Sequence, residues 1–483
     1  MPAPAPPAGR CRPVGMAPAP AGTVPVPTGW RLRLAAGVRV LRAGQVLLGG
    51  SPLRSLTLSA RGTTLLIGWL AGHPVSEDRA ERLLARRLLD AGLADPDPRA
   101  WPRPSGPEVT IVVPVYGAPD RLQSCLAALA GGWPMIVVDD GSPDGPAIAT
   151  VAERFGARYV RLPENRGASA ARNVGLRLAS TPLIAFLDAD CCPPPDFPGA
   201  LLDHLADPAL ALVAPRIVTG ARNAGRIARY ERVRSALDMG PAPALVRPYG
   251  LVWYVPSAAM VARRDALLAG FDEELRLGED VDLVWRLHDA GWQVRYDPRI
   301  AVAHEDRVRP GAWYRRRVGY NESVAPLLRR HPERVPVLFL SPLAAFAWGA
   351  ALGGVSWPVA VLTALRAARL RRALAGRLPR AGTWAAKAAL DITVREAHDL
   401  GRAVAGPWAP LAGVVERRRL ALLLAAMIVR DWRDDRPPLD LPSYAALRLA
   451  DESSRGVGIW LGCLRAWDFR ALLPRRPPPP SRR

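Results

Sequence analysis

Two apolar segments of the chain each end in a group of carboxylates, and this feature constrains the fold more than any other. Residues 183–187 are five consecutive apolar residues followed by Asp-Ala-Asp at 188–190. Residues 135–138 are also apolar and precede Asp-Asp-Gly-Ser at 139–142. Short apolar runs of this kind are typical of buried strands, and open α/β sheets bind ligands at the carboxyl ends of their strands. Because divalent cations that accompany nucleotide phosphates prefer carboxylate oxygens, the sequence predicts a nucleotide-diphosphate site with a bridging cation.

The surrounding sequence alternates between strand and helix patterns, which is the signature of a parallel α/β sheet. Strands are expected at 109–113, 135–138, 157–161 and 183–187, and helices at 120–130, 148–155 and 169–179. This order predicts the first half of a nucleotide-binding fold.

The N-terminal part differs in composition and in its pattern of apolar residues. Residues 1–27 are rich in Pro and Ala and are expected to be disordered. Residues 28–101 form a small α+β module, with short strands at 30–34, 38–41 and 45–48 and helices at 63–71 and 76–91. The module resembles the winged-helix domain of coenzyme-PQQ chaperones, which implies a grip on a precursor peptide or a dock for pathway proteins. A small scaffold packed on its neighbour is the alternative.

The C-terminal part, residues 331–473, is expected to be helical and ends in a basic tail at 474–483. Residues 337–365 contain no charged side chain and are flanked by arginines. Such a stretch is long enough to cross a bilayer, but its glycines and prolines also allow a helical hairpin in one leaflet or a buried helix pair. Residues 420–429 are too short to cross and could lie along a membrane surface.

The net charge of +21 comes almost entirely from arginine. No aromatic-interleaved basic stretch or zinc spacing accompanies it, so nucleic acid is not expected as the substrate. Binding of phosphates or of anionic lipid headgroups accounts for the positive charge instead.

The five cysteines lack metal spacing and favour reduced thiols. The expected location is the cytoplasm, either on the inner face of the cell membrane or in loose association with it.

Five motifs in a fixed order carry a family resemblance. They are Pro-Val-Tyr at 114–116, Asp-Asp-Gly-Ser at 139–142, Asn-Arg-Gly at 165–167 with Ala-Arg-Asn at 171–173, Asp-Ala-Asp at 188–190, and Gly-Glu-Asp at 278–280. Together they resemble the family 2 inverting glycosyltransferases of the GT-A fold. The resemblance covers roughly residues 107–320, and it implies a GT-A domain at 107–330.

The resemblance implies a donor site for a nucleoside-diphosphate sugar. Pro114 and Tyr116 would wall the base pocket, Asp139 and Asp140 would bind base and ribose, and Asp188 would lie near the ribose. A divalent cation, Mg²⁺ or Mn²⁺, held by Asp190 would meet the charge of the leaving diphosphate. The remaining residues predicted to bind substrate are Asn165, Arg172, Glu279 and Trp253. For Arg172, predicted to meet phosphate at a helix start, the alternative is a surface salt bridge.

Inversion in one displacement needs one carboxylate to take the proton of the acceptor hydroxyl, and the resemblance assigns that role to Asp280. An ordinary helix cap would explain the same acid. His304 follows another short apolar strand and would complete the cation shell, unless it is structural. Trp253 offers an aromatic surface for stacking on a sugar or acceptor ring, although a core strand would look similar.

One departure limits the prediction: the Gln-x-x-Arg-Trp signature of processive synthases is absent, and residues 284–287 do not match it. The whole layout resembles the glycosyltransferases of mycofactocin systems. That resemblance implies transfer of glucose from UDP-glucose, in β-1,4 linkage, to a peptide-derived redox cofactor. Lipid-linked or cell-wall glycan acceptors are the enzymatic alternative, and a non-catalytic peptide-binding scaffold is the alternative outside enzymes.

Overall fold

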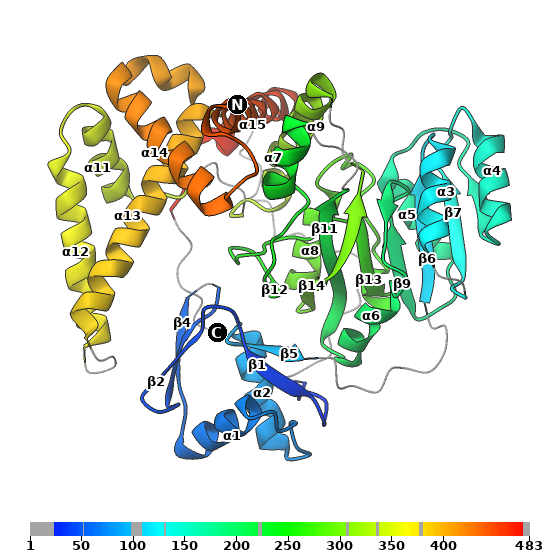
Figure 1. Ribbon diagram of the computed structural model, residues 1–483, viewed down its shortest axis with the longest axis horizontal. Coiled ribbons are helices and arrows are strands. Elements are labelled where there is room, and N and C mark those ends of the chain that lie inside the picture. The colour runs from blue at the N-terminus through cyan, green and yellow to red at the C-terminus, as the bar shows by residue number, and fades with distance from the viewer. Residues whose placement is uncertain are drawn as a thin grey trace, which may run out of the picture. The chain divides into compact units, whose positions relative to one another are not determined.

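The structure is a computed structural model that describes residues 24–51, 53–97, 109–129, 132–220, 225–305, 309–334, 338–375 and 380–476. The chain divides into two compact units, one of residues 1–218 and 237–305 and the other of residues 219–236 and 306–483. Figure 1 shows the elements of both.

The first unit is built around a mixed sheet with strand order β10-β14-β11-β13-β9-β6-β7-β8, with β12 paired to β14. Strands β9, β6, β7 and β8 are parallel, and β13 joins β9 in the antiparallel sense. The strands are β6 (Val109–Val115), β7 (Met135–Asp139), β8 (Arg158–Arg161), β9 (Leu183–Leu187), β10 (Cys191–Cys192), β11 (Leu210–Thr219), β12 (Ala244–Val246), β13 (Ala259–Arg263) and β14 (Gln293–His304). The predicted α/β class is therefore confirmed.

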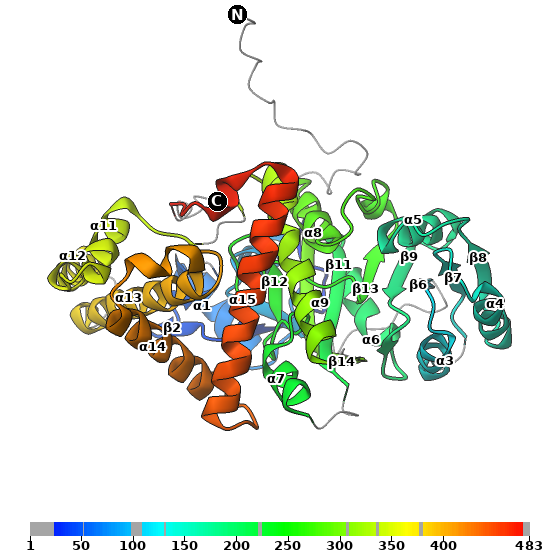
Figure 2. The ribbon, with the colours of Figure 1, turned by 90° about the horizontal axis from the view of Figure 1, so that it is seen from above.

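Helices cover both faces of the parallel strands. Side chains of successive residues in a strand point to opposite faces, so a buried strand packs against helices on both sides. Ile111 and Val113 belong to the core that contains α3 (Pro119–Ala128) and α4 (Gly145–Arg154). Val112 faces α5 (Ala168–Leu178), which lies on the opposite side of the sheet from α3 (Figure 2). A Cβ on Gly175 would lie 2.2 Å from Val112 Cγ1, so only glycine allows α5 to approach β6 this closely. The chain then continues through α6 (Gly199–Leu202) and α8 (Glu279–Asp289).

The N-terminal module has its own hydrophobic core, centred on residues such as Trp30, Trp69 and Leu88. Its elements are β1 (Arg31–Leu34), β2 (Arg39–Leu41), β3 (Val46–Gly49), β4 (Arg54–Thr57), α1 (Ala60–Leu70), α2 (Arg79–Asp90) and β5 (Ala94–Asp97). β2, β3 and β4 form one sheet, and β1 pairs with β5. The predicted α+β content is confirmed, β4 and β5 were not predicted, and the likeness to a winged helix stays a prediction.

The module and the central sheet belong to the same compact unit and share buried polar contacts. Arg86 Nη2 lies 2.6 Å from Asp207 Oδ1, and both side chains are almost fully buried. Gln293 at the start of β14 donates to Asp90 Oδ1 at 2.5 Å, and Arg247 donates to the carbonyl of Asp90 at 3.0 Å. A buried guanidinium–carboxylate pair fixes orientation tightly, since either charge alone would be costly to bury.

The second unit is helical. It contains α7 (Arg226–Arg234), α9 (Pro310–Glu322), α10 (Val324–Arg330), α11 (Pro342–Leu352), α12 (Trp357–Leu374), α13 (Ala381–Ala405), α14 (Arg417–Asp435) and α15 (Leu441–Ala466). The GT-A domain was predicted to run to residue 330, whereas α7, α9 and α10 group with this unit. Arg317 of α9 forms ion pairs with Glu231 of α7 and with Asp451 of α15, and the nitrogen–oxygen distance is 2.7 Å in both.

Within the charge-free stretch at 337–365, the described residues include α11 and the first half of α12, joined by a turn at Gly353 and Gly354. This is the two-helix alternative of the sequence prediction. Among the residues that the structure describes, no helix combines the length and apolarity needed to cross a membrane.

Candidate active site

The predicted site residues begin at the carboxyl edge of the parallel strands. Val115 at the end of β6 is in register with Asp139 at the end of β7, and Asp140 N donates to the Val115 carbonyl at 2.9 Å. β9 runs parallel to β6 on its other side and ends one residue before Asp188. Neighbouring strands therefore bring the acids of two distant motifs to one edge of the sheet.

The two acids at the end of β7, Asp139 and Asp140, hold the backbone that surrounds them. Asp139 is fully buried and accepts from Ser142 N at 2.8 Å, Tyr159 Oη at 2.8 Å and Arg161 Nη1 at 2.7 Å. Asp140 accepts from the backbone amides of Arg166 and Gly167, each at 2.8 Å. Asp140 thereby ties β7 to the residues that begin α5, and direct contact of either acid with a base or ribose stays a prediction.

Arg172 of α5 lies at the centre of the acidic motifs. Its Nη2 donates to Asp188 Oδ1 at 2.6 Å and its Nη1 to Glu279 Oε1 at 3.0 Å. Burial alone would lower the pKa of the guanidinium, but the charges of Asp188 and Glu279 outweigh it and raise the pKa. The alternative of a surface salt bridge is wrong in one respect, because the Arg172 side chain is only 2% exposed. The predicted contact with phosphate stays a prediction and would have to share a guanidinium that already binds two carboxylates.

Asp280 stands at the start of α8, one residue after Glu279. Gly278 precedes them with a φ of 83°, a left-handed conformation that glycine adopts without strain. Asp280 Oδ2 accepts from Ser257 N at 3.3 Å, and Ser257 Oγ lies 3.2 Å from Glu279 Oε1. Burial first, and then the charge of Glu279, raise the pKa of Asp280 from 3.8 to about 7. A carboxylate with a pKa near neutrality is suited to accept a proton at physiological pH.

The predicted cation ligands are brought together by strand pairing. β10 pairs with β14 so that Cys191 faces His304, and this places His304 Nε2 3.4 Å from Asp190 Oδ1. The backbone amide of Glu305 also donates to the Asp190 carbonyl at 3.0 Å. A carboxylate with an imidazole is a donor set that Mn²⁺ or Mg²⁺ accepts, with substrate phosphates and water supplying the rest. No third His, Cys, Asp or Glu joins them within the part of the chain that the structure describes.

The remaining predicted residues line the same region less tightly. Pro114 is a buried residue of β6 opposite Val138, whereas Tyr116 is 57% exposed. Asn165 Oδ1 accepts from Arg276 at 3.2 Å. Trp253 is partly exposed, its ring centroid lies 5.8 Å from that of Trp285, and its carbonyl accepts from Trp285 Nε1 at 2.9 Å. Trp253 is thus held against α8 with part of its ring accessible to a ligand.

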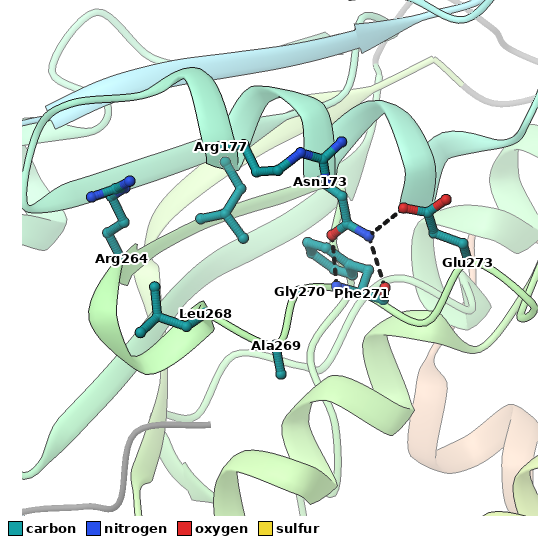
Figure 3. A pocket seen from close by; sticks show the side chains of 9 residues that line it. Asn173, Arg177, Arg264, Leu268, Ala269, Gly270, Phe271 and Glu273 are labelled. Atoms are coloured by element: carbon teal, nitrogen blue, oxygen red, sulfur yellow. Dashed lines mark hydrogen bonds between the residues drawn. The ribbon is translucent and has the colours of Figure 1, made fainter. Parts of the chain in front are cut away.

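Two residues that were not predicted as site residues also position this cluster. Ser257 bridges Glu279 and Asp280 as described above, and the only signal near it in the sequence was Trp253, four residues earlier. Asn173 of α5 accepts from Phe271 N at 2.8 Å and donates to the Phe271 carbonyl and to Glu273, each at 2.9 Å (Figure 3). These bonds fix the segment that leads to Gly278, so Asn173 supports α8 rather than facing a ligand.

The hollow drawn in Figure 3 is not the predicted site. It measures about 350 Å³ and is lined by Asn173, Leu176, Arg177, Arg264, Leu268, Ala269, Gly270, Phe271 and Glu273. None of the predicted donor, base or cation residues lines it. The predicted site therefore lies elsewhere, with the acids that surround Arg172.

Comparison with known sequences agrees with the motif analysis. Residues 110–268 match the family model "Glycosyl transferase family 2". The chain is 38% identical over 486 residues to a pre-mycofactocin glycosyltransferase of Mycobacterium tuberculosis (strain CDC 1551 / Oshkosh), covering 93% of this chain and 98% of that protein. It is also 27% identical over 214 residues to glycosyltransferase AglE of Haloferax volcanii, covering 42% of this chain and 68% of that protein.

Among solved structures, the chain is similar to mannosyltransferase PcManGT from Pyrobaculum calidifontis, in complex with GDP-Man and Mn²⁺. The TM-score is 0.37 at 22% identity, with 70% of this chain and 90% of that chain covered. A glucosyl-3-phosphoglycerate synthase from Mycobacterium tuberculosis gives a TM-score of 0.32 at 20% identity, with 48% of this chain and 86% of that chain covered.

Proposed function

Because the chain belongs to the family 2 glycosyltransferases, we propose that it transfers glucose from UDP-glucose, with inversion and in β-1,4 linkage, to pre-mycofactocin. The 38% identity to the pre-mycofactocin enzyme extends over 93% of this chain and 98% of that protein. The similarity therefore includes the segments on both sides of the catalytic domain. This is the observation that carries the choice of acceptor.

The chemistry rests on the carboxylates gathered around Arg172. Its ion pairs hold the Asp188 and Glu279 side chains in place, so the donor meets a site that is organised before it binds. Asp190 and His304 are the residues that would hold a divalent cation. When bound, the cation would supply positive charge to the diphosphate that leaves.

Asp280 is the proposed base. The acceptor hydroxyl attacks the anomeric carbon from the face opposite UDP, its proton passes to the Asp280 carboxylate, and the electrons of the breaking carbon–oxygen bond leave with UDP. The new bond forms on the opposite face of the sugar, which is inversion. With a pKa of about 7, a substantial fraction of the carboxylate is ionised near neutral pH, and the group is basic enough to take the proton.

The test is a donor and acceptor screen with the full-length chain. UDP-glucose, UDP-N-acetylglucosamine and GDP-mannose are each offered with pre-mycofactocin, with Mn²⁺ or Mg²⁺ or with neither, and products are read by mass spectrometry. We expect hexose addition from UDP-glucose with a cation present, and none with Asp280→Asn. No product from UDP-glucose under conditions where another donor reacts would overturn the choice of sugar.

The exposed apolar side chains of α11 and α12 favour one competing acceptor class, lipid-linked glycans. The same screen therefore includes a lipid-linked glycan acceptor. Transfer to it, with pre-mycofactocin untouched, would replace the proposed acceptor while leaving the catalytic assignment in place.

A further inference from the structure

Helices α11 and α12 expose an apolar face to solvent. It consists of Leu343, Phe346, Trp357, Val361 and Leu365, which we call the hairpin face; their exposed fractions are 69%, 70%, 65%, 45% and 61%. Single exposed apolar residues are common on protein surfaces, but a contiguous group of large ones marks a contact with a partner or a membrane.

The side of α12 that packs inward is defined by its contacts with α13. Thr363 Oγ1 lies 2.8 Å from Thr393 Oγ1, and Arg366 forms a two-bond ion pair with Glu396 at 2.6 and 2.9 Å. At 100° per residue, positions 357, 361 and 365 fall on the opposite side of the helix. On α11, Trp348 Nε1 donates to Glu396 of α13 at 3.1 Å, whereas Leu343 and Phe346 are exposed. The hairpin face therefore lies on the side of both helices away from α13.

The same outer side becomes cationic toward the end of α12. Arg372 continues the stripe of Trp357, Val361 and Leu365, and Arg369 and Arg371 flank it. All three arginines are exposed. None has a carboxylate partner among the residues that the structure describes. Apolar side chains beside unpaired guanidinium groups are the combination that binds anionic lipid surfaces, where the first enter the acyl boundary and the second meet the headgroups.

We propose that the hairpin face and these three arginines dock the enzyme on an anionic lipid bilayer, with α11 and α12 lying in the interface. A helix that lies in the interface buries only its apolar face, to a depth of about 5–10 Å, and the hairpin face supplies such a face on both helices. The arginines account for a preference for anionic headgroups over a neutral bilayer. This proposal stands independently of the acceptor.

Vesicle flotation tests the docking with the full-length chain. Vesicles of phosphatidylcholine alone and of phosphatidylcholine with phosphatidylglycerol are centrifuged with the protein in low and high salt. We expect flotation with the anionic vesicles, less at high salt because surface charges are screened, and little with the neutral ones. Phe346→Ser combined with Trp357→Ser should reduce the partition coefficient at least tenfold. Arg369→Gln combined with Arg372→Gln should abolish the preference for anionic vesicles.

Leu53→Ser is the matched control, because Leu53 is also a large exposed apolar residue, 71% exposed, in the N-terminal module. It should float like the unaltered chain, and circular dichroism of every variant checks the fold. Flotation of the Phe346/Trp357 variant at the wild-type level, or no flotation with either vesicle type, overturns the proposal. A dimer seen by light scattering that the same variant dissociates would assign the face to a second copy and also overturn it.

Discussion

Asp280→Asn should raise the stability of the folded protein at alkaline pH while abolishing transfer. The pKa of Asp280 rises from 3.8 to about 7 on folding, and at about 1.4 kcal/mol per unit this corresponds to about 4 kcal/mol. Asparagine removes that cost, but it carries one acceptor oxygen where Asp280 uses two, for Ser257 N and Val281 N. Losing one of these bonds costs about 1–2 kcal/mol. The net gain should therefore be about 2 kcal/mol.

The sign depends on pH. An acid with a higher pKa in the folded state destabilises the protein as pH rises between the two values, because the unfolded chain releases its proton first. The cost of ionising Asp280 is absent below pH 3.8, grows up to about pH 7 and is fully present above it. The gain from Asp280→Asn should accordingly appear at pH 8 and not at pH 4, where only the lost hydrogen bond remains.

Urea unfolding of wild type and variant at the two pH values measures this difference, and a transfer assay is run in parallel. Asp282→Asn is the control on the same helix: Asp282 Oδ2 accepts from Arg286 at 2.6 Å, so its substitution should destabilise at pH 8. An Asp280→Asn protein that is less stable than wild type at pH 8, or that retains transfer, would refute the reasoning about this carboxylate.

Three further outcomes follow from named contacts. Glu279→Gln removes the charge that, after burial, does most to raise the pKa of Asp280, so the acidic limb of kcat/KM should move about one unit lower; an unchanged pH profile would contradict the coupling. Asp190→Ala should weaken Mn²⁺-dependent binding of UDP-glucose at least about tenfold, measured by calorimetry with and without metal, whereas the exposed Asp196→Ala should not. Arg86→Ala leaves Asp207 buried without its guanidinium and should lower the free energy of unfolding by about 3–5 kcal/mol, whereas urea unfolding of the exposed neighbour Arg87→Ala should show little change.

Local patterns predicted the elements that carry the site. The strand expected at 183–187 is β9 with the same bounds, and the helix expected at 169–179 is α5, which runs from Ala168 to Leu178. These patterns succeed because burial imposes a period on the sequence that each segment shows by itself. The meeting of acids from β7 and β9 at one sheet edge followed from the general geometry of parallel sheets.

Contacts between distant segments could not be predicted from periodicity. The pairing of Cys191 with His304 depends on strand order, and the Arg86–Asp207 ion pair joins residues 121 positions apart. β5 has the sequence Ala-Asp-Pro-Asp, which has little intrinsic preference for a strand and takes that form by pairing with β1. The hydropathy of 337–365 likewise did not reveal that the chain turns at Gly353.

The geometry of Asp280 bears on the choice between a helix cap and a base. A capping carboxylate accepts bonds from orphan amides of the first turn and is favoured there in its charged form, which lowers its pKa. α8 has Gly278 as its N-cap and no side-chain capping bond. Asp280 does accept from Val281 N in the first turn, but it also accepts from Ser257 on another segment, and its pKa is raised rather than lowered because burial and the charge of Glu279 outweigh these bonds. Holding an acid here costs stability that a cap would have supplied, and the proposed role in taking the proton of the acceptor would account for that cost.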